Sequence, residues 1–120
     1  MHYDLLVHVD LADAKRMSMA LTNIKNYNNA LESEHKLGKD YHVVVLANAG
    51  AVSFLLEKSE EHFTVIKELA QAGVEFRACN NALNKHGIKP EDLPAHVQVV
   101  KAGIVEIVDL QRAGYAYLKP

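Results

Sequence analysis

The sequence predicts an α/β fold, a three-layer α/β/α sandwich with a mostly parallel five-stranded sheet. Short apolar runs of strand length alternate along the chain with longer segments whose apolar residues recur at helical spacing. One run, YHVVVLA at residues 41–47, is almost continuously apolar and rich in β-branched residues, which is typical of a strand covered on both faces. The alternation implies right-handed β-α-β crossovers with helices on both sides of the sheet.

The first strand and the first helix are predicted from a change of spacing. Residues 3–9 form a short apolar run that predicts a buried strand ending at Asp10. From Asp13 onward the apolar residues follow helical spacing, and we expect this helix to end near the polar stretch 32–40. Its apolar face consists of Ala14, Met17, Leu21, Ile24 and Leu31.

The strand at residues 41–47 is followed by turn residues 48–50 and by a short helical segment at residues 53–58. Ser59 is expected to cap the next helix, because a serine oxygen accepts hydrogen bonds from the free amides of a first turn. That helix is expected to end at Gly73 in the left-handed conformation that glycine favours.

The second half of the chain continues the alternation, with strands expected at residues 74–79, 96–100 and 115–118. Asn80 is expected to cap a brief helix, and Gly103 to begin a last helix that ends at Gly114. The last helix is apolar on more than one narrow stripe, at Ile104, Val105, Ile107, Val108 and Leu110. Either the sheet and loops of the same chain bury it on two sides, or the protein self-associates through it.

Composition and charge are those of an ordinary globular protein, and we expect residues 1–120 to form a single domain. The chain is 49% hydrophobic and 23% charged, and a chain of this length can bury a core without metals or disulfides. Lys and Arg number 13 against 15 Asp and Glu, which gives a net charge of -2 with no basic block. This balance disfavours nucleic acid as a partner.

Targeting and membrane-spanning patterns are absent from the sequence. The chain begins MHYDLLVHVD, without a basic region or a long apolar run, and no apolar stretch approaches the length that spans a bilayer. We therefore expect a cytoplasmic protein with no membrane partner. A single cysteine cannot form an intrachain disulfide, which fits a reducing compartment.

Open parallel sheets bind ligands at the carboxyl ends of their strands. GxGxxG and GxxxxGK[ST] are both missing from the chain, so dinucleotide and P-loop nucleotide sites are excluded. The turn DLADAK after the first strand also lacks the Ser, Thr and Gly residues of a flavodoxin-like phosphate site. The residues that the predicted strand ends present are Asp10, Asn48, Gly50, Cys79, Asn80, Asn81, Ala102 and Gly103.

Histidine and cysteine spacing predicts no metal site. The seven histidines occur singly and the lone cysteine forms no CxxC pair, so a structural zinc site is not expected. His8 lies near the end of the first predicted strand and either approaches the ligand crevice or is a packed or solvated strand residue.

Cys79 is the position where the arrangement favours chemistry. If it ends a strand and precedes a helix capped by Asn80, the helix dipole stabilises its thiolate, which is the nucleophilic form. Arg77 points to the same face roughly 7 Å away on the same strand and would add a positive charge. The competing interpretation is an inert, buried thiol.

Two stretches resemble the DsrE/DsrF-like family, and within it a small, stand-alone group. They are VEFRACNNAL at residues 74–83 and VVKAGIVEIVDLQRAGYAYLKP at residues 99–120, and strand and helix order extends the resemblance over nearly the whole chain. In family members that relay sulfur, the cysteine matched here by Cys79 carries sulfur as a persulfide. The resemblance also implies a three-layer fold and a trimer or hexamer, which would account for the apolar last helix.

One family feature has no counterpart in this chain. Many relatives have a His-Gly turn after the second strand, whereas this chain has Asn48, Ala49 and Gly50. No role for that histidine carries over.

The resulting hypothesis is a sulfur carrier or sulfurtransferase with Cys79 as its catalytic residue. The thiolate would take a sulfane sulfur from a donor protein and pass it to an acceptor protein by thiol exchange, without metal or organic cofactor. Asn80 and Asn81 would stabilise the anionic sulfur, unless they only cap and solvate the first helical turn. Asn48, Gly50 and Gly103 complete the predicted substrate-binding set.

Two other functions remain open from the sequence. The first is a non-catalytic, oligomeric module that binds a small ligand or a partner protein at the same crevice. The second is a reversible redox-sensing thiol, which would form a sulfenic acid or an intermolecular disulfide on mild oxidation.

Overall fold

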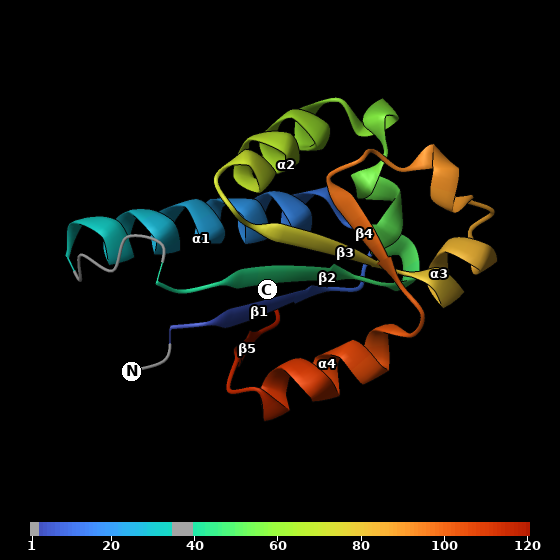
Figure 1. Ribbon diagram of the computed structural model, residues 1–120. Helices are drawn as coiled ribbons and strands as arrows, with labels where there is room; N and C mark the ends of the chain where they lie inside the picture. Colours follow the sequence, from blue (N-terminus) through green and yellow to red (C-terminus); the bar gives the residue numbers. More distant parts are fainter. Residues whose placement is uncertain (1–2, 35–39) are drawn as a thin grey trace.

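The computed structural model describes residues 3–34 and 40–120, and its centre is a five-stranded sheet in which every pairing is parallel (Figure 1). The strand order is β4-β3-β2-β1-β5. The strands are β1 (Leu5–Val9), β2 (Val43–Ala47), β3 (Glu75–Cys79), β4 (Val97–Val100) and β5 (Ala116–Leu118). The predicted five-stranded parallel architecture is confirmed.

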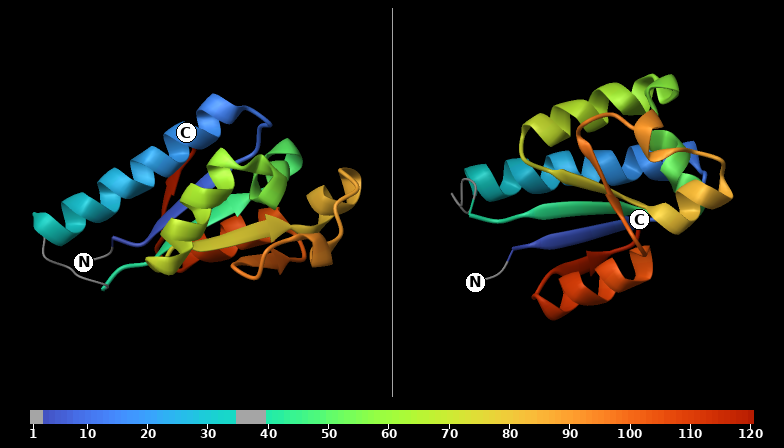
Figure 2. Two further views of the ribbon diagram at one scale, coloured as in Figure 1. Left: turned by 90° about the horizontal axis from the view of Figure 1, so that it is seen from above. Right: turned by 45° about the vertical axis from the view of Figure 1, so that its right-hand side comes forward.

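Helices cover both faces of the sheet, but unequally. Figures 1 and 2 show α1 (Ala14–Ser33) and α2 (Glu61–Gln71) on one face and α4 (Gly103–Arg112) alone on the other. The short α3 (Asn80–Lys85) directly follows β3. Three 3-10 helices complete the described chain, η1 (Ala49–Leu55), η2 (Glu57–Ser59) and η3 (Pro90–Asp92). The predicted three-layer sandwich is confirmed.

The larger core lies between the sheet and the pair α1 and α2. Strands β1 and β2 are buried at every position, as expected for strands covered on both faces. The bulkiest side chains of this core include Met17, Ile24, Ile66 and Phe76, all fully buried. The core beneath α4 is smaller and consists of Leu6, Val44, Leu46, Val100, Ile107 and Leu110.

Helix α4 leaves an apolar face uncovered. Ile104, Val105 and Val108 are 67%, 55% and 44% exposed, while Ile107 and Leu110 pack on the sheet. Of the two explanations that the sequence left open, burial of this helix on two sides by its own chain is therefore wrong. We call Ile104, Val105 and Val108 the exposed α4 face.

The start of α1 and the ends of α2 and α4 lie where the sequence places them, and residues close in the chain determine each one. Asp13 caps α1, and its carboxylate accepts hydrogen bonds from the backbone amides of Lys15 and Arg16 at 3.0 and 3.1 Å. Gly73 and Gly114 follow α2 and α4 with φ of 104° and 97°, the left-handed conformation that glycine adopts without strain.

Two predicted helix caps are wrong. Ser59 lies in η2, where its hydroxyl donates to the Ser53 carbonyl at 2.9 Å, and Glu60 occupies the position before α2. Asn80 is the first residue of α3, and Cys79 occupies the position before it. Neither helix has a side-chain cap.

Element boundaries also differ from the prediction in small ways. The helical segment expected at residues 53–58 begins at Ala49, within the predicted turn, as the 3-10 helix η1. Each strand begins one or two residues later than predicted, a difference typical of boundary assignment. Part of the predicted polar stretch 32–40, namely residues 35–39, lies outside the described residues. Among the residues that are described, no helix is long and apolar enough to cross a membrane.

Candidate functional site

Cys79 is the last residue of β3, at the carboxyl edge of the sheet, and is 6% exposed. Its sulfur accepts a hydrogen bond from the backbone N–H of Gly103, with an N···Sγ distance of 3.3 Å. Gly103 is the first residue of α4, so the sulfur faces the N-terminus of a ten-residue helix. The free amides of a first helical turn favour negative charge, so α4 presents an oriented hydrogen-bond donor to the Cys79 sulfur.

The close approach of α4 to Cys79 requires glycine at position 103. A Cβ atom added there would lie 3.2 Å from Cys79 Cβ and 3.5 Å from both Cys79 Sγ and Leu46 Cδ2. The first of these distances is shorter than ordinary van der Waals contact between carbons. Gly103 thus permits the close approach of α4 and supplies a hydrogen-bond donor that the sequence did not reveal.

Arg77 binds carboxylates on either side of it. Its guanidinium donates to Glu75 Oε2 at 2.8 Å and to Glu106 Oε2 at 2.9 Å. Because Glu106 belongs to α4, the pair ties β3 to the helix whose first amide binds the sulfur. The hydrogen bonds of Arg77 go to carboxylates and not to the thiol, and they give this residue a role in positioning α4.

The Glu75 carboxylate extends this polar network, through His42, to Tyr115, the residue before β5. Glu75 Oε2 lies 3.2 Å from His42 Nε2, and His42 Nδ1 lies 2.6 Å from the Tyr115 hydroxyl. Burial raises the pKa of Tyr115, so the phenol keeps its proton and donates to His42. Arg77 therefore connects β3 with Glu106 in α4, and His42 connects the start of β2 with Tyr115, which follows α4.

Asn48 and His8 form a second polar group on this side of the sheet. His8 Nε2 donates to Asn48 Oδ1 at 2.9 Å, and the Tyr117 hydroxyl donates to His8 Nδ1 at 2.6 Å. Both ring nitrogens are used and His8 is only 9% exposed. Strand β2 separates His8 from β3, so the packed interpretation of this histidine holds.

The other predicted site residues lie at the same edge without binding the sulfur. An added Cβ on Gly50 would lie 2.8 Å from Ala12 Cβ, so this glycine lets η1 pack against the loop after β1. Asn81 is exposed and Asn80 half-buried, and neither side chain caps α3. Of the predicted set, Gly103 is the residue that hydrogen-bonds Cys79.

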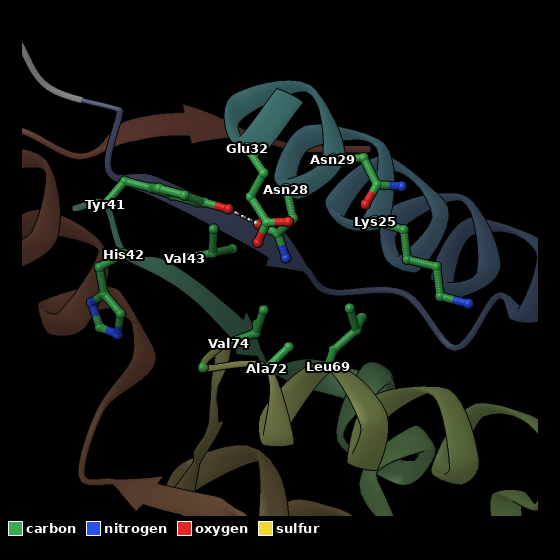
Figure 3. A pocket seen from close by; sticks show the side chains of 11 residues that line it. Lys25, Asn28, Asn29, Glu32, Tyr41, His42, Val43, Leu69, Ala72 and Val74 are labelled. Atoms are coloured by element: carbon green, nitrogen blue, oxygen red, sulfur yellow. Dashed lines mark hydrogen bonds between the residues drawn. The ribbon is translucent and has the colours of Figure 1, made fainter. Parts of the chain in front are cut away.

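Two further features bear on the chemistry available. No group of three or more His, Cys, Asp or Glu side chains within residues 3–34 and 40–120 is arranged to hold a metal ion. A cavity of about 550 Å³ lies at the amino end of the sheet, between α1 and α2, and its lining includes Val43 and Val74 at the starts of β2 and β3 (Figure 3). This cavity is thus at the opposite end of β3 from Cys79.

Comparisons with known proteins agree with this fold. The chain is similar to the protein of unknown function MTH1491 from Methanobacterium thermoautotrophicum, with a TM-score of 0.87 and 33% sequence identity over 98% of this chain and 99% of that one. The ychN protein from E. coli has a TM-score of 0.74 at 15% identity, over 98% of this chain and 99% of that one, which shows a shared fold. No curated protein matches the chain.

The family comparison covers almost the entire sequence. The model of the DsrE/DsrF-like family matches residues 7–120, a span that contains Cys79, Gly103 and all five strands except the first two residues of β1. The chain belongs to the DsrE/DsrF-like family.

Proposed function

We propose that this protein carries sulfane sulfur as a persulfide on Cys79, as a sulfur carrier or sulfurtransferase. Family membership supports a role in sulfur relay. The observation that carries the proposal is the hydrogen bond from the Gly103 N–H to Cys79 Sγ, because it presents an oriented donor to a sulfur that must bear negative charge to react.

The transfer consists of two exchange reactions. The Cys79 thiolate attacks the outer sulfur of a donor persulfide, R–S–SH; a bond from Sγ to that sulfur forms, the donor S–S bond breaks, and its electron pair leaves on the donor thiolate. An acceptor thiolate then attacks the outer sulfur of Cys79–S–SH and releases the Cys79 thiolate. The sulfane sulfur moves without net oxidation or reduction, so neither step needs an external oxidant.

The residues around Cys79 stabilise negative charge on its sulfur and hold α4 in position. Gly103 N–H and the first turn of α4 stabilise the thiolate before attack and again when it leaves. Arg77 and Glu106 hold α4 in place for this purpose. Asn80 and Asn81 follow the cysteine at the edge from which a donor approaches, and their amides are available to the incoming sulfur.

Self-association is part of the proposal. The exposed α4 face begins at Ile104, directly after the residue that binds the sulfur. A second copy packed on this face, in a trimer or hexamer, would cover three exposed apolar side chains and lie beside Cys79. Donor and acceptor proteins would then reach the site from the remaining open edge.

The test is intact mass spectrometry of reduced protein incubated with a sulfane sulfur donor, alongside a Cys79→Ser variant. We expect the wild-type chain to gain the mass of one sulfur atom, to lose it on addition of a reductant, and to pass it to an added thiol. The variant should gain nothing. No gain by the wild-type chain would contradict the proposal.

A binding module without turnover is the second candidate, and the low exposure of Cys79, 6%, favours it. Under this alternative the thiol packs against α4 as a small apolar group. Alkylation of the folded protein distinguishes the two. A thiol that resists iodoacetamide until the chain is unfolded, together with no sulfur gain, would mean that Cys79 only packs and would favour the binding module.

A further inference from the structure

The cavity at the amino end of the sheet has an apolar side and a polar side. Val43, Leu69, Ala72 and Val74 supply the apolar side, while α1 contributes polar residues across from them (Figure 3). Its volume of about 550 Å³ lies in the range of small-molecule sites. His42 also lines it, although both ring nitrogens are engaged with Tyr115 and Glu75.

The polar side is a single stripe of helix α1. Lys25, Asn28 and Glu32 follow one another at helical spacing, so they share one face, with opposite charges about 10 Å apart along the axis. Within the described part of the chain neither charge has an ion-pair partner. The stripe therefore presents a positive end, an amide centre and a negative end.

The Asn28 amide is already oriented. The Tyr41 hydroxyl donates to Asn28 Oδ1 at 2.7 Å, and Tyr41 packs edge-on against Tyr27 with ring centroids 5.9 Å apart. Burial raises the pKa of Tyr41, and the nearby Glu32 carboxylate raises it further, so the phenol remains a donor. With Oδ1 occupied, the Asn28 NH₂ group is left to donate to a carbonyl or carboxylate oxygen.

The end of α2 reinforces the negative end of the stripe. Figure 3 shows Ala72 below Glu32 and Leu69 closer to Lys25. The last carbonyl groups of a helix carry partial negative charge. A positively charged group is therefore favoured between Glu32 and the end of α2, and a negatively charged group is favoured near Lys25.

We propose that this cavity binds a zwitterionic, peptide-like small molecule of about three residues. Its amino group lies at Glu32, its carboxylate at Lys25, and a central carbonyl accepts from Asn28, while apolar side chains pack on Val43 and Leu69. Three extended residues span at most about 10–11 Å, which matches the separation of the two charges. This proposal is independent of sulfur carriage at Cys79.

Calorimetric titration of the full chain with the tripeptide Ala-Leu-Ala tests this site. We expect saturable binding, weakened about tenfold or more when both peptide termini are blocked by acetyl and amide groups. Lys25→Met and Glu32→Gln should each weaken binding about tenfold, because each removes one charged partner. Glu68→Gln, an exposed change on α2 outside the cavity lining, should leave the affinity unchanged.

Two results would overturn the site. One is the absence of saturable binding up to about 10 mM peptide. The other is equal affinity in Glu32→Gln and Glu68→Gln, which would show that the charge at the cavity is not used. Circular dichroism of each variant confirms that the fold is intact, and every variant retains Cys79, so the sulfur-transfer assay can be run on the same samples.

Discussion

Gly103 and Cys79 are joined by a backbone hydrogen bond and by close packing at the same time. A glycine in a first helical turn is not unusual, but here its missing Cβ is what allows the N–H to reach within 3.3 Å of the sulfur. The φ of Gly103 lies outside the left-handed region. An alanine at this position would therefore be disfavoured by sterics alone, which makes the contact testable.

Gly103→Ala is expected to push α4 away from Cys79. The new Cβ, 3.2 Å from Cys79 Cβ, would have to be relieved by a shift of the helix, at a cost of about 1–3 kcal/mol in the free energy of unfolding. The shift lengthens the N–H···Sγ contact and so weakens the hydrogen bond that favours negative charge on the sulfur. Because iodoacetamide reacts with the thiolate, we expect it to alkylate Cys79 several-fold more slowly at neutral pH. Urea unfolding and alkylation kinetics measure the two effects.

Gly87→Ala is the matched control for this change. Gly87 has a φ of 68° and open space around its Cα, so alanine costs about 1–2 kcal/mol through backbone strain without touching the thiol. Its alkylation rate should equal that of the wild type. If Gly103→Ala and Gly87→Ala react alike, the hydrogen bond does not govern the thiol.

Sequence reasoning could identify both residues but not the bond between them. Cys79 ends β3 and Gly103 follows β4, and the carboxyl ends of parallel strands converge at one edge. The bond itself depends on how far α4 leans toward the sheet. That distance is fixed by Ile107 and Leu110 in the core and by the Arg77–Glu106 ion pair, which join residues distant in the sequence.

At the level of elements, the prediction succeeded where local signals were sufficient. The order in which strands and helices follow one another, the start of α1 next to Asp13 and the Gly73 terminus follow from short-range chemistry. The segment at residues 49–59 did not follow the prediction, because two 3-10 helices occupy it. Within them the Ser59 hydroxyl bonds to the Ser53 carbonyl and is no longer available as a cap.

The packing of edge strand β4 against α2 should depend on pH through His96. This residue precedes β4, its ring lies 5.6 Å from that of Phe63, and its Nε2 is buried without a hydrogen-bond partner. Burial lowers the pKa of His96, and the positive charge of Lys67 lowers it further. The folded protein therefore resists protonation of this ring more than the unfolded chain does.

The lowered pKa of His96 in the folded protein determines how stability changes with pH. With a lowered folded-state pKa, the unfolded chain binds more protons below the ordinary histidine value of 6.5, so stability is present above that pH and is lost as the pH falls. We expect the free energy of unfolding, measured by urea unfolding at fixed protein concentration, to fall less between about pH 7.5 and about pH 5.5 for His96→Gln than for the wild type. The exposed-loop variant His86→Gln serves as control; equal losses in all three would rule His96 out.

For the whole molecule, the sheet separates two candidate sites. Cys79 lies at its carboxyl edge beside α4, and the cavity between α1 and α2 lies at its amino edge. The two helical layers are also unequal, with the single helix α4 on one face and α1 with α2 on the other (Figures 1 and 2). The thinly covered face carries α4, whose first residue hydrogen-bonds Cys79 and whose exposed α4 face lies uncovered.

Self-association through the exposed α4 face is the expectation that this asymmetry supports. Val105 is 55% exposed on that face, so Val105→Lys leaves the core of one subunit intact while placing a charge in the proposed contact. A buried, unpaired charge at an interface is strongly unfavourable. We expect size-exclusion chromatography with light scattering at micromolar concentration to give a trimer or hexamer for the wild type and a monomer for Val105→Lys.

A second lysine variant separates the apolar contact from a general effect of charge. Gln71 is exposed at the end of α2, which covers the other face of the sheet (Figure 1), so Gln71→Lys adds the same charge away from α4 and should remain oligomeric. If the wild-type chain is itself a monomer, the apolar face does not pair copies of this chain. If both lysine variants dissociate, charge alone controls assembly. An oligomer lost only in Val105→Lys would establish α4 as the contact and would place the partner copy beside Cys79.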